Sequence, residues 1–191
     1  MVTINPAIYR SLNFAPSDLV PVVALANFNQ MLVCAPASGL RTLDQLDAAA
    51  RKTPGSLSYA SGGQGVPGHL AMELYLAGAG LNVLHVPYKG PSPAAQDVLA
   101  GQVPCGFLAS PVVASYVTAG KLNGLAVSGS TRSTVAPDIP TMSQAGVAGY
   151  DATFREMLFA PKGTPEAIVR RMNEEVARAL ARPDVKRKLQ A

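Results

Sequence analysis

The sequence predicts an α/β protein in which helices pack on a parallel sheet. Short apolar segments alternate with helical segments between residues 42 and 127, which is the pattern of strand–helix–strand units. Most of these helical segments are bounded by capping residues at the start and by glycine at the end. With 191 residues, of which 48% are hydrophobic, the chain is long enough to bury a sizeable core.

The first regular elements are a strand expected at residues 31–35 and a helix that follows it. Thr42 and Gln45 form a capping box, which predicts that this helix begins with Thr42 as its N-cap. The Thr-Pro-Gly sequence at residues 53–55 ends the helix, and the next strand is expected at residues 57–60.

A glycine-rich segment separates this strand from the next helix. The helix is expected at residues 68–76 and ends at Gly78 or Gly80, because glycine adopts the left-handed conformation that stops helices. A strand follows at residues 83–86.

Two further helices share one set of boundary residues. Each has Ser at the expected N-cap, Pro directly after it and Gly at its end. These residues are Ser92, Pro93 and Gly101 for one helix, and Ser110, Pro111 and Gly120 for the other. The strands that follow these helices are expected at residues 105–108 and 122–127.

The two ends of the chain have less regular patterns. After Ser128 we expect a long loop through Gly163, and then a helix that opens at Thr164 and Pro165. Four apolar residues at i+4 spacing give this helix one apolar face: Ile168, Met172, Val176 and Leu180. We interpret the two ends as pieces of a second unit, with too few strands to form a sheet by themselves.

Composition excludes several classes of protein. The 17 Gly and 16 Pro stay below the level of low-complexity chains, so disorder is excluded for most of the chain. No apolar run approaches the roughly 18 residues of a transmembrane helix. Residues 1–10 have no basic stretch followed by an apolar core, so no signal peptide is predicted in this chain.

The formal net charge of +4 does not make nucleic acid an expected partner. Many of the basic residues lie in the C-terminal helical segment, where cations complement the helix dipole. No basic stretch is interleaved with aromatic residues, and Trp is absent. We therefore expect no nucleic acid among the partners.

The two cysteines, Cys34 and Cys105, lie in separate strand-like segments far apart in sequence. The sequence has no CxxC pair and no Cys/His cluster, so no metal site of that type is predicted. Two buried reduced thiols are the favoured interpretation, and one structural disulfide is the alternative.

The sharpest local feature is the glycine-rich loop, residues 61–69, which reads Ser-Gly-Gly-Gln-Gly-Val-Pro-Gly-His. It contains a GxGxxG pattern, but the next strand has no acidic residue at its end to hold the ribose of a dinucleotide. Glycines let backbone N–H groups approach a ligand, and the helix that follows presents unpaired N–H groups. Two interpretations stay open, namely a site for a carboxylate or another small anion and a tight turn without a ligand.

Residues 85–90, His-Val-Pro-Tyr-Lys-Gly, follow the next strand. They place Tyr88 and Lys89 at the same edge of the sheet as the glycine-rich loop, where open α/β sheets bind ligands. Lys89 is a candidate partner for an anion and Tyr88 a candidate hydroxyl donor, whereas the alternative is a solvated lysine beside a partly buried tyrosine. Ser110 ends another strand at this edge, as a plain N-cap or as a further ligand contact.

No catalytic machinery is predicted. His69 and His85 have no Asp or Cys at motif spacing, and no GxSxG is present. Paired carboxylates occur only at Glu174 and Glu175, which lie on different faces of a helix. No metal-ligand spacing occurs, and no cofactor is expected. These features favour binding over turnover, so the chain is not predicted to be an enzyme.

Several segments, in order along nearly the whole chain, resemble the substrate-binding proteins of tripartite tricarboxylate transporters, the Bug or TctC-like family. The most specific are His-Val-Pro-Tyr-Lys-Gly at 85–90 and Pro-Asp-Ile-Pro-Thr at 137–141. Others are Tyr-Ala-Ser-Gly-Gly-Gln-Gly at 59–65 and Ala-Pro-Lys-Gly-Thr-Pro at 160–165.

This resemblance implies a periplasmic-binding-protein-like fold of type II, with two α/β domains around a cleft. On that map residues 43–123 form the complete second domain, and residues 1–42 with 124–191 form a remnant of the first. Family members begin with an export signal, a strand and a glycine-rich carboxylate-binding loop. This chain starts after those segments, so we expect its first domain to be incomplete.

The resemblance also implies a function, which is the capture of a small carboxylate in the periplasm for the membrane permease subunits of a transporter. The ligand-binding residues are expected in the glycine-rich loop and at the neighbouring strand ends: Ser61, Gly62, Gly63, Gln64, Gly65, Val66, His69, Tyr88, Lys89 and Ser110. Two alternatives stay open, a carboxylate-sensing module for a signalling receptor and a non-binding remnant that self-associates. An incomplete first domain predicts a homodimer formed through that domain.

Overall fold

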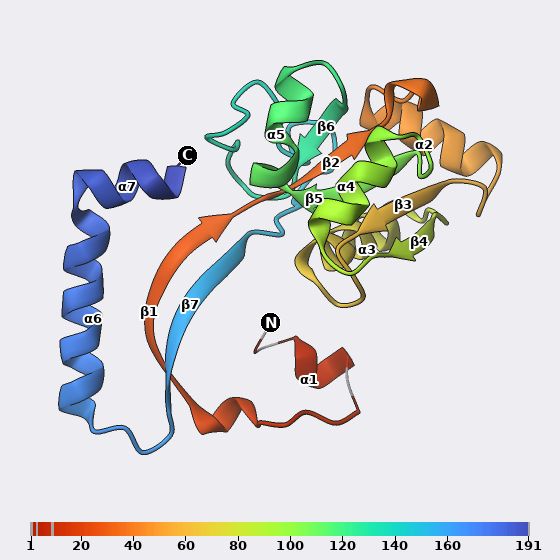
Figure 1. Cartoon of the computed structure of the whole chain (residues 1–191). Helices are drawn as coiled ribbons and strands as arrows, with labels where there is room; N and C mark the ends of the chain where they lie inside the picture. Colours follow the sequence, from red (N-terminus) through yellow and green to blue (C-terminus); the bar gives the residue numbers. More distant parts are fainter. Residues whose placement is uncertain (1, 3, 9, 191) are drawn as a thin grey trace. The chain divides into compact units, whose positions relative to one another are not determined.

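The computed structural model describes residues 2, 4–8 and 10–190, and it divides into two compact units (Figure 1). One unit is Phe28–Phe154. The other joins the chain up to Asn27 to the chain from Arg155 onward. The larger unit extends beyond the domain boundaries expected after residues 42 and 123, and that assignment of ligand-binding domains stays a prediction.

The larger unit contains a five-stranded sheet with the order β4-β3-β5-β2-β6. Its strands are β2 (Gln30–Cys34), β3 (Ser58–Ser61), β4 (Leu84–Pro87), β5 (Cys105–Ala109) and β6 (Asn123–Val127). β3 runs parallel to β4 and β5, but β2 is antiparallel to both β5 and β6. The expectation of a wholly parallel sheet is therefore wrong. β2 follows directly on another strand, with no crossover helix to set its direction.

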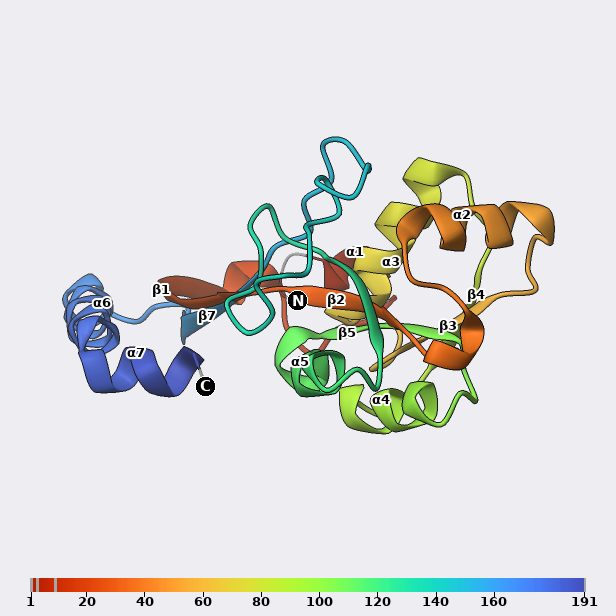
Figure 2. The same ribbon diagram turned by 90° about the horizontal axis from the view of Figure 1, so that it is seen from above.

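Four helices cover the two faces of this sheet (Figure 2). They are α2 (Leu43–Lys52), α3 (Pro67–Ala79), α4 (Pro91–Leu99) and α5 (Ser110–Thr118). Successive residues of β2 face opposite sides: Leu32 packs in the core under α2 and α3, and Met31 in the core under α4 and α5. Each face of the sheet is covered by a separate apolar core. The loops that follow the strands therefore lie at the ends of the sheet and not over its faces.

The start of α2 agrees with the sequence, and the starts of α4 and α5 do not. The side chain of Thr42 caps α2 by accepting a hydrogen bond from the Gln45 N–H at 3.3 Å. The predictions of Ser92 and Ser110 as N-caps are wrong, because the N-caps are Gly90 and Ala109. For α4, Pro91 already supplies the fixed φ that starts a helix.

Cys34 and Cys105 form a disulfide, which corrects the favoured interpretation of two free thiols. The two residues face each other directly on the antiparallel strands β2 and β5. The Ala35 N–H donates to the Pro104 carbonyl next to them, so they form a non-hydrogen-bonded pair, in which side chains are closest. The sequence did not reveal this pairing because it depends on which strands are neighbours.

The smaller unit contains β1 (Leu19–Phe28) and β7 (Phe154–Pro161), which pair as a two-stranded sheet. Its helices are α1 (Asn5–Ile8), α6 (Glu166–Ala181) and α7 (Pro183–Gln190); short 3-10 turns lie at η1 (Pro16–Asp18) and, in the larger unit, at η2 (Pro36–Ser38). The side chain of Asn173 on α6 donates to the Val22 carbonyl of β1 at 2.7 Å.

Neither strand of this small sheet was predicted from the sequence. β7 lies inside the segment expected as a loop after Ser128, where Arg155 and Glu156 interrupt any apolar alternation. β1 contains Pro21, a residue typical of loops and edge strands. Within the described part of the chain, no helix has both the length and the apolar character that a membrane span requires.

Candidate functional site

The glycine-rich loop lies where β3 ends and α3 begins, and its backbone conformation requires glycine. Gly63 has φ +139° and Gly65 has φ +71°, values that other residues rarely adopt. A Cβ on Gly62 would lie 3.1 Å from the backbone nitrogen of Pro91, so this position is also sterically crowded. The absence of side chains at these positions therefore permits the conformation of the loop.

The helix after this loop begins without a side-chain cap. Its N-cap is Val66, whose side chain has no hydrogen-bonding atom, and Pro67 follows. The first N–H groups of any helix have no partner inside the helix, so this end carries partial positive charge. A Cβ on Gly68 would lie 2.0 Å from the carbonyl oxygen of Phe107. The helix α3 can approach β5 this closely because residue 68 has no side chain.

Tyr88, Lys89 and Gly90 lie against the glycine-rich loop. The Tyr88 N–H donates to the Ser61 carbonyl at 3.0 Å, and the Gly90 N–H donates to the Gly62 carbonyl at 2.9 Å. The expected placement of these residues at one edge of the sheet is therefore seen in the structure. Lys89 is exposed and forms no ion pair with a described residue.

The Tyr88 hydroxyl already has a partner, because it donates to a carboxylate oxygen of Asp97 on α4 at 2.6 Å. Burial, followed by this hydrogen bond, raises the pKa of Tyr88 to about 12. Ser110 is buried, and its hydroxyl donates to the Asn29 carbonyl at 2.9 Å. Both hydroxyl protons are therefore used inside the protein.

His85 lies against the start of the loop, and the sequence did not predict a role for it at the site. Its Nε2 lies 2.7 Å from Oγ of Ser61, which in turn donates to the Gly63 carbonyl at 2.9 Å. The His85 ring stacks on Tyr59 with centroids 4.9 Å apart. Burial, with a smaller contribution from His69, lowers the pKa of His85 to about 4. At neutral pH this ring is uncharged and supports the start of the loop.

His69 supports the other end of the loop from the first turn of α3. The Gly65 N–H donates to its Nδ1 at 3.1 Å, which places the ring proton on Nε2. That Nε2 lies 4.0 Å from a carboxylate oxygen of Glu73, which also accepts a hydrogen bond from the Tyr59 hydroxyl at 2.8 Å. The ring of His69 therefore contacts the backbone of the loop, and its expected role in ligand binding stays a prediction.

The predicted ligand-binding residues differ in their exposure and in their distance from the loop. Ser61 and Gly65 are buried, Gly62, Gly63, Val66 and His69 are half-buried, and Gln64 is exposed. Ser110 lies two strands away from β4, at the end of β5. Motif spacings in the sequence do not indicate His85 and Glu73, whose only signal is that they lie on elements next to the loop.

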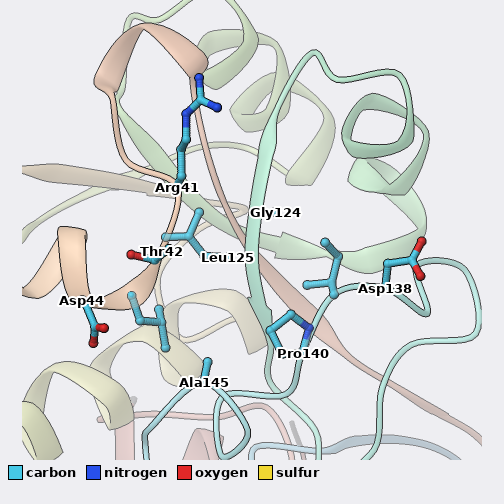
Figure 3. Close-up of a pocket in the computed structure, with 10 residues that line it drawn as sticks. Arg41, Thr42, Asp44, Gly124, Leu125, Asp138, Pro140 and Ala145 are labelled. Carbon is cyan, nitrogen blue, oxygen red and sulfur yellow. The ribbon is translucent and has the colours of Figure 1, made fainter.

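A separate cavity of about 350 Å³ lies at the opposite edge of this sheet, where β2 ends and β6 begins (Figure 3). Its apolar lining includes Leu43, Leu125 and Pro140. Figure 3 shows Arg41 and Asp44 pointing in opposite directions, and Asp138 adds a second carboxylate to the lining. One cation beside two carboxylates does not favour an anionic ligand. Among the described residues, no group of His, Cys, Asp and Glu is arranged to hold a metal ion.

Comparison with known proteins connects this chain to one family of receptors. The family model for the tripartite tricarboxylate transporter family receptor, TctC, matches residues 1–191. A UPF0065 protein in the tcbD-tcbE intergenic region of Pseudomonas sp. (strain P51) is 40% identical over 169 residues, 88% of this chain and 50% of that protein. Protein BugT of Bordetella pertussis is 35% identical over 163 residues, 85% of this chain and 50% of that protein.

Solved structures show the same fold. A protein from R. palustris with adipate has a TM-score of 0.85 and 31% identity, and the match covers 95% of this chain and 61% of that one. The periplasmic binding protein BugD has a TM-score of 0.85, 26% identity and coverages of 99% and 64%. MatC from Rhodopseudomonas palustris with bound malate has a TM-score of 0.82, 28% identity and coverages of 95% and 62%.

These matches confirm the expected fold, the type II fold of periplasmic binding proteins. The chain spans about half the length of the first relatives that it matches. Relatives in this family are periplasmic solute-binding proteins. The chain belongs to the TctC family of tripartite tricarboxylate transporter receptors.

Proposed function

We propose that this chain captures a small carboxylate at the glycine-rich loop and delivers it to the membrane permease subunits of a tripartite tricarboxylate transporter. The ligand's carboxylate binds at the N-terminus of α3 beside the glycine-rich loop, where the first N–H groups of the helix have no intrahelical partner. Lys89 adds a positive charge beside the loop. The protein acts in the periplasm as a binding protein and not as an enzyme.

One observation carries this proposal, namely the uncapped start of α3 behind a loop that only glycine can form. Val66 offers no side-chain cap, and Gly63 and Gly65 hold positive φ values that cost free energy for other residues. Backbone N–H groups at such a position favour a carboxylate. The carboxylates in the related structures, adipate and malate, supply the ligand class.

The proposal is tested by calorimetric titration of malate and adipate into the full chain. Gly65→Val places a branched side chain at φ +71° in the loop, and we expect binding to be lost. Gly120→Val is the matched control, because Gly120 has φ +68° with no atom within 4 Å but precedes β6 at the opposite edge of the sheet. Full affinity in the Gly65→Val variant would contradict the assignment of the site.

We also propose that the chain self-associates as a two-fold dimer through its smaller unit. On α6 no residue is buried, and Ile168 is 50% exposed. The two-stranded sheet of β1 and β7 has two edge strands, which are sites for pairing with another chain. Exposed apolar side chains and unpaired strand edges together favour an interface between copies.

Light scattering at micromolar concentration tests this dimer. We expect a mass of two chains for the native protein and of one chain for Ile168→Glu. Leu84→Glu is the control, because Leu84 is 55% exposed on β4 of the other unit. A native monomer with one cooperative melt would show that the smaller unit needs no second copy.

A further inference from the structure

The backbone N–H of Gly65 is held by the imidazole ring of His69. Gly65 is buried, and its N–H donates to Nδ1 of His69 at 3.1 Å. Buried backbone N–H groups in native proteins are nearly always paired, so the shape of the loop at this position depends on that ring. Glycine permits the φ of +71° at Gly65 but does not enforce it, because glycine also adopts other conformations readily.

This hydrogen bond requires one tautomer of His69. Nδ1 can accept from the Gly65 N–H only when it carries no proton, so the neutral ring must carry its proton on Nε2. The tautomer of a histidine is set by the partner of its other ring nitrogen. A group that attracts the proton to Nε2 therefore favours the conformation of the loop, although it lies on the other side of the ring.

Glu73 is the group that lies on this other side. It follows His69 by one turn of α3, and its Oε1 lies 4.0 Å from His69 Nε2. The same oxygen accepts a hydrogen bond from the Tyr59 hydroxyl at 2.8 Å. Tyr59 is buried on β3, and burial, followed by this hydrogen bond, raises its pKa, so its hydroxyl stays a donor. A core residue therefore holds the Glu73 carboxylate beside the ring.

His85 contacts the His69 ring and has its own fixed tautomer. The centroids of the two rings lie 4.2 Å apart. The single hydroxyl proton of Ser61 goes to the Gly63 carbonyl, so Nε2 of His85 donates to Ser61 Oγ, 2.7 Å away. His85 therefore carries its proton on Nε2 as well, for a reason that does not involve Glu73.

We propose that Glu73 is a positioning residue of the carboxylate site. Its carboxylate keeps the proton of the neutral His69 ring on Nε2, and Nδ1 then holds Gly65 and the glycine-rich loop in the conformation that the ligand meets. Glu73 itself does not touch the ligand in this arrangement. This role rests on the proposed function and adds to it the group that keeps the site preformed, which lowers the cost of ordering the loop on binding.

Ring NMR of the ligand-free full chain tests the tautomer directly. The chain has two histidines, and His85→Gln assigns their signals. In the 15N-labelled native chain at pH 8.5, we expect the ring nitrogen shifts of both histidines to show a protonated Nε2 and a bare Nδ1.

The variant Glu73→Gln should change the tautomer of one ring and not of the other. The Glu73 side chain is 50% exposed, so this variant is expected to fold. An amide can donate to Nε2 as well as accept from it, so we expect a mixture of the two tautomers for His69 and no change for His85. A structural role alone would lower the melting temperature and leave the tautomer of His69 unchanged.

Calorimetric titrations with malate connect the tautomer to binding. We expect Glu73→Gln to weaken malate affinity by about threefold to tenfold. The control is Glu174→Gln, an exposed glutamate on α6 of the smaller unit, for which affinity is expected to stay unchanged. His69→Asn is the rescue, because its side-chain oxygen takes the place of Nδ1 and accepts from Gly65 with no tautomer to set. In the His69→Asn background, Glu73→Gln should therefore have no further effect on affinity.

Three results would overturn the role of Glu73 and leave the proposed function intact. The first is a protonated Nδ1 on His69 in the native chain, and the second is unchanged malate affinity in Glu73→Gln. The third is a loss of affinity in Glu73→Gln that persists at full size in the His69→Asn background. A native chain that binds neither malate nor adipate would overturn both proposals, and the two failures stay distinguishable because the tautomer is measured without ligand.

Discussion

Oγ of Ser61 lies 2.7 Å from Nε2 of His85, and this contact joins the end of β3 to the start of β4 beneath the glycine-rich loop. Two backbone hydrogen bonds also join the ends of these strands: the Tyr88 N–H donates to the Ser61 carbonyl, and the Gly90 N–H donates to the Gly62 carbonyl. The loop therefore has a fixed base made from two strands. A preformed loop needs less ordering when a ligand binds, which favours affinity.

The neutral state of His85 predicts a loss of stability in acid. Its pKa lies at about 4 in the folded protein, below the ordinary value of 6.5, so the unfolded chain takes up a proton that the folded chain does not. Stability should therefore fall as the pH drops from about 6.5 to about 4, and this contribution is absent above that range. Because the ring is partly solvated, we expect an effect on the order of 1 kcal/mol.

Urea unfolding at pH 7.5 and at pH 4.5 measures this effect. The native protein is compared with His85→Gln, which keeps a neutral polar side chain but does not titrate. We expect the difference in unfolding free energy between the two pH values to be smaller for the variant. Equal differences in both proteins would show that His85 does not contribute.

Gly68 is expected to be the least tolerant glycine of α3. A Cβ at this position would lie 2.0 Å from the Phe107 carbonyl oxygen, so Gly68→Ala must push the helix away from β5. We expect a loss of about 1–3 kcal/mol in unfolding free energy. Gly78→Ala on the same helix is the control, because no atom lies within 4 Å of its Cβ; it should be neutral or stabilise by about 0.5–1 kcal/mol. Similar results for both would contradict the close packing of α3.

The disulfide between Cys34 and Cys105 should contribute strongly to stability. It joins residues separated by 71 positions, so it restricts the unfolded chain over a long loop. The chain-entropy relation gives about 4 kcal/mol for a loop of this length. We expect the replacement of both cysteines by Val to lower the urea midpoint accordingly. Thiol titration of the denatured, unreduced protein should find no free thiol, and two thiols per chain would exclude the disulfide.

Lys89 should strengthen anion binding through its charge. It is exposed beside the loop and forms no ion pair with a described residue, so Lys89→Met should weaken carboxylate binding by about 1–2 kcal/mol. Lys121→Met is the control, because Lys121 is also exposed but precedes β6 at the opposite edge. Calorimetric titrations at low salt measure both. Equal affinity in the native protein and in Lys89→Met would leave Lys89 as a solvated side chain.

Local signals in the sequence were sufficient for the features that depend on a few neighbouring residues. The capping of α2 by Thr42 involves residues three positions apart. The glycine-rich turn after β3 follows from glycine itself, and the placement of Tyr88 and Lys89 beside it follows from the geometry of parallel strands. These features do not depend on distant parts of the chain.

Features that depend on strand order could not be derived in this way. The direction of β2, the pairing of Cys34 with Cys105, and the contact of Ser61 with His85 all require knowledge of which strands are neighbours. All three involve residues more than 20 positions apart.

The most direct test of the carboxylate site is an NMR titration of the 15N-labelled full chain with malate at millimolar concentration. We expect the largest changes in amide chemical shift at residues of the glycine-rich loop such as Gly62, Gly63 and Gly65, because the loop lies beside the proposed binding position. Residues of the cavity at the opposite edge, such as Leu43 and Gly124, should change little. Shifts confined to that cavity, or no shifts in the loop, would contradict carboxylate binding at the start of α3.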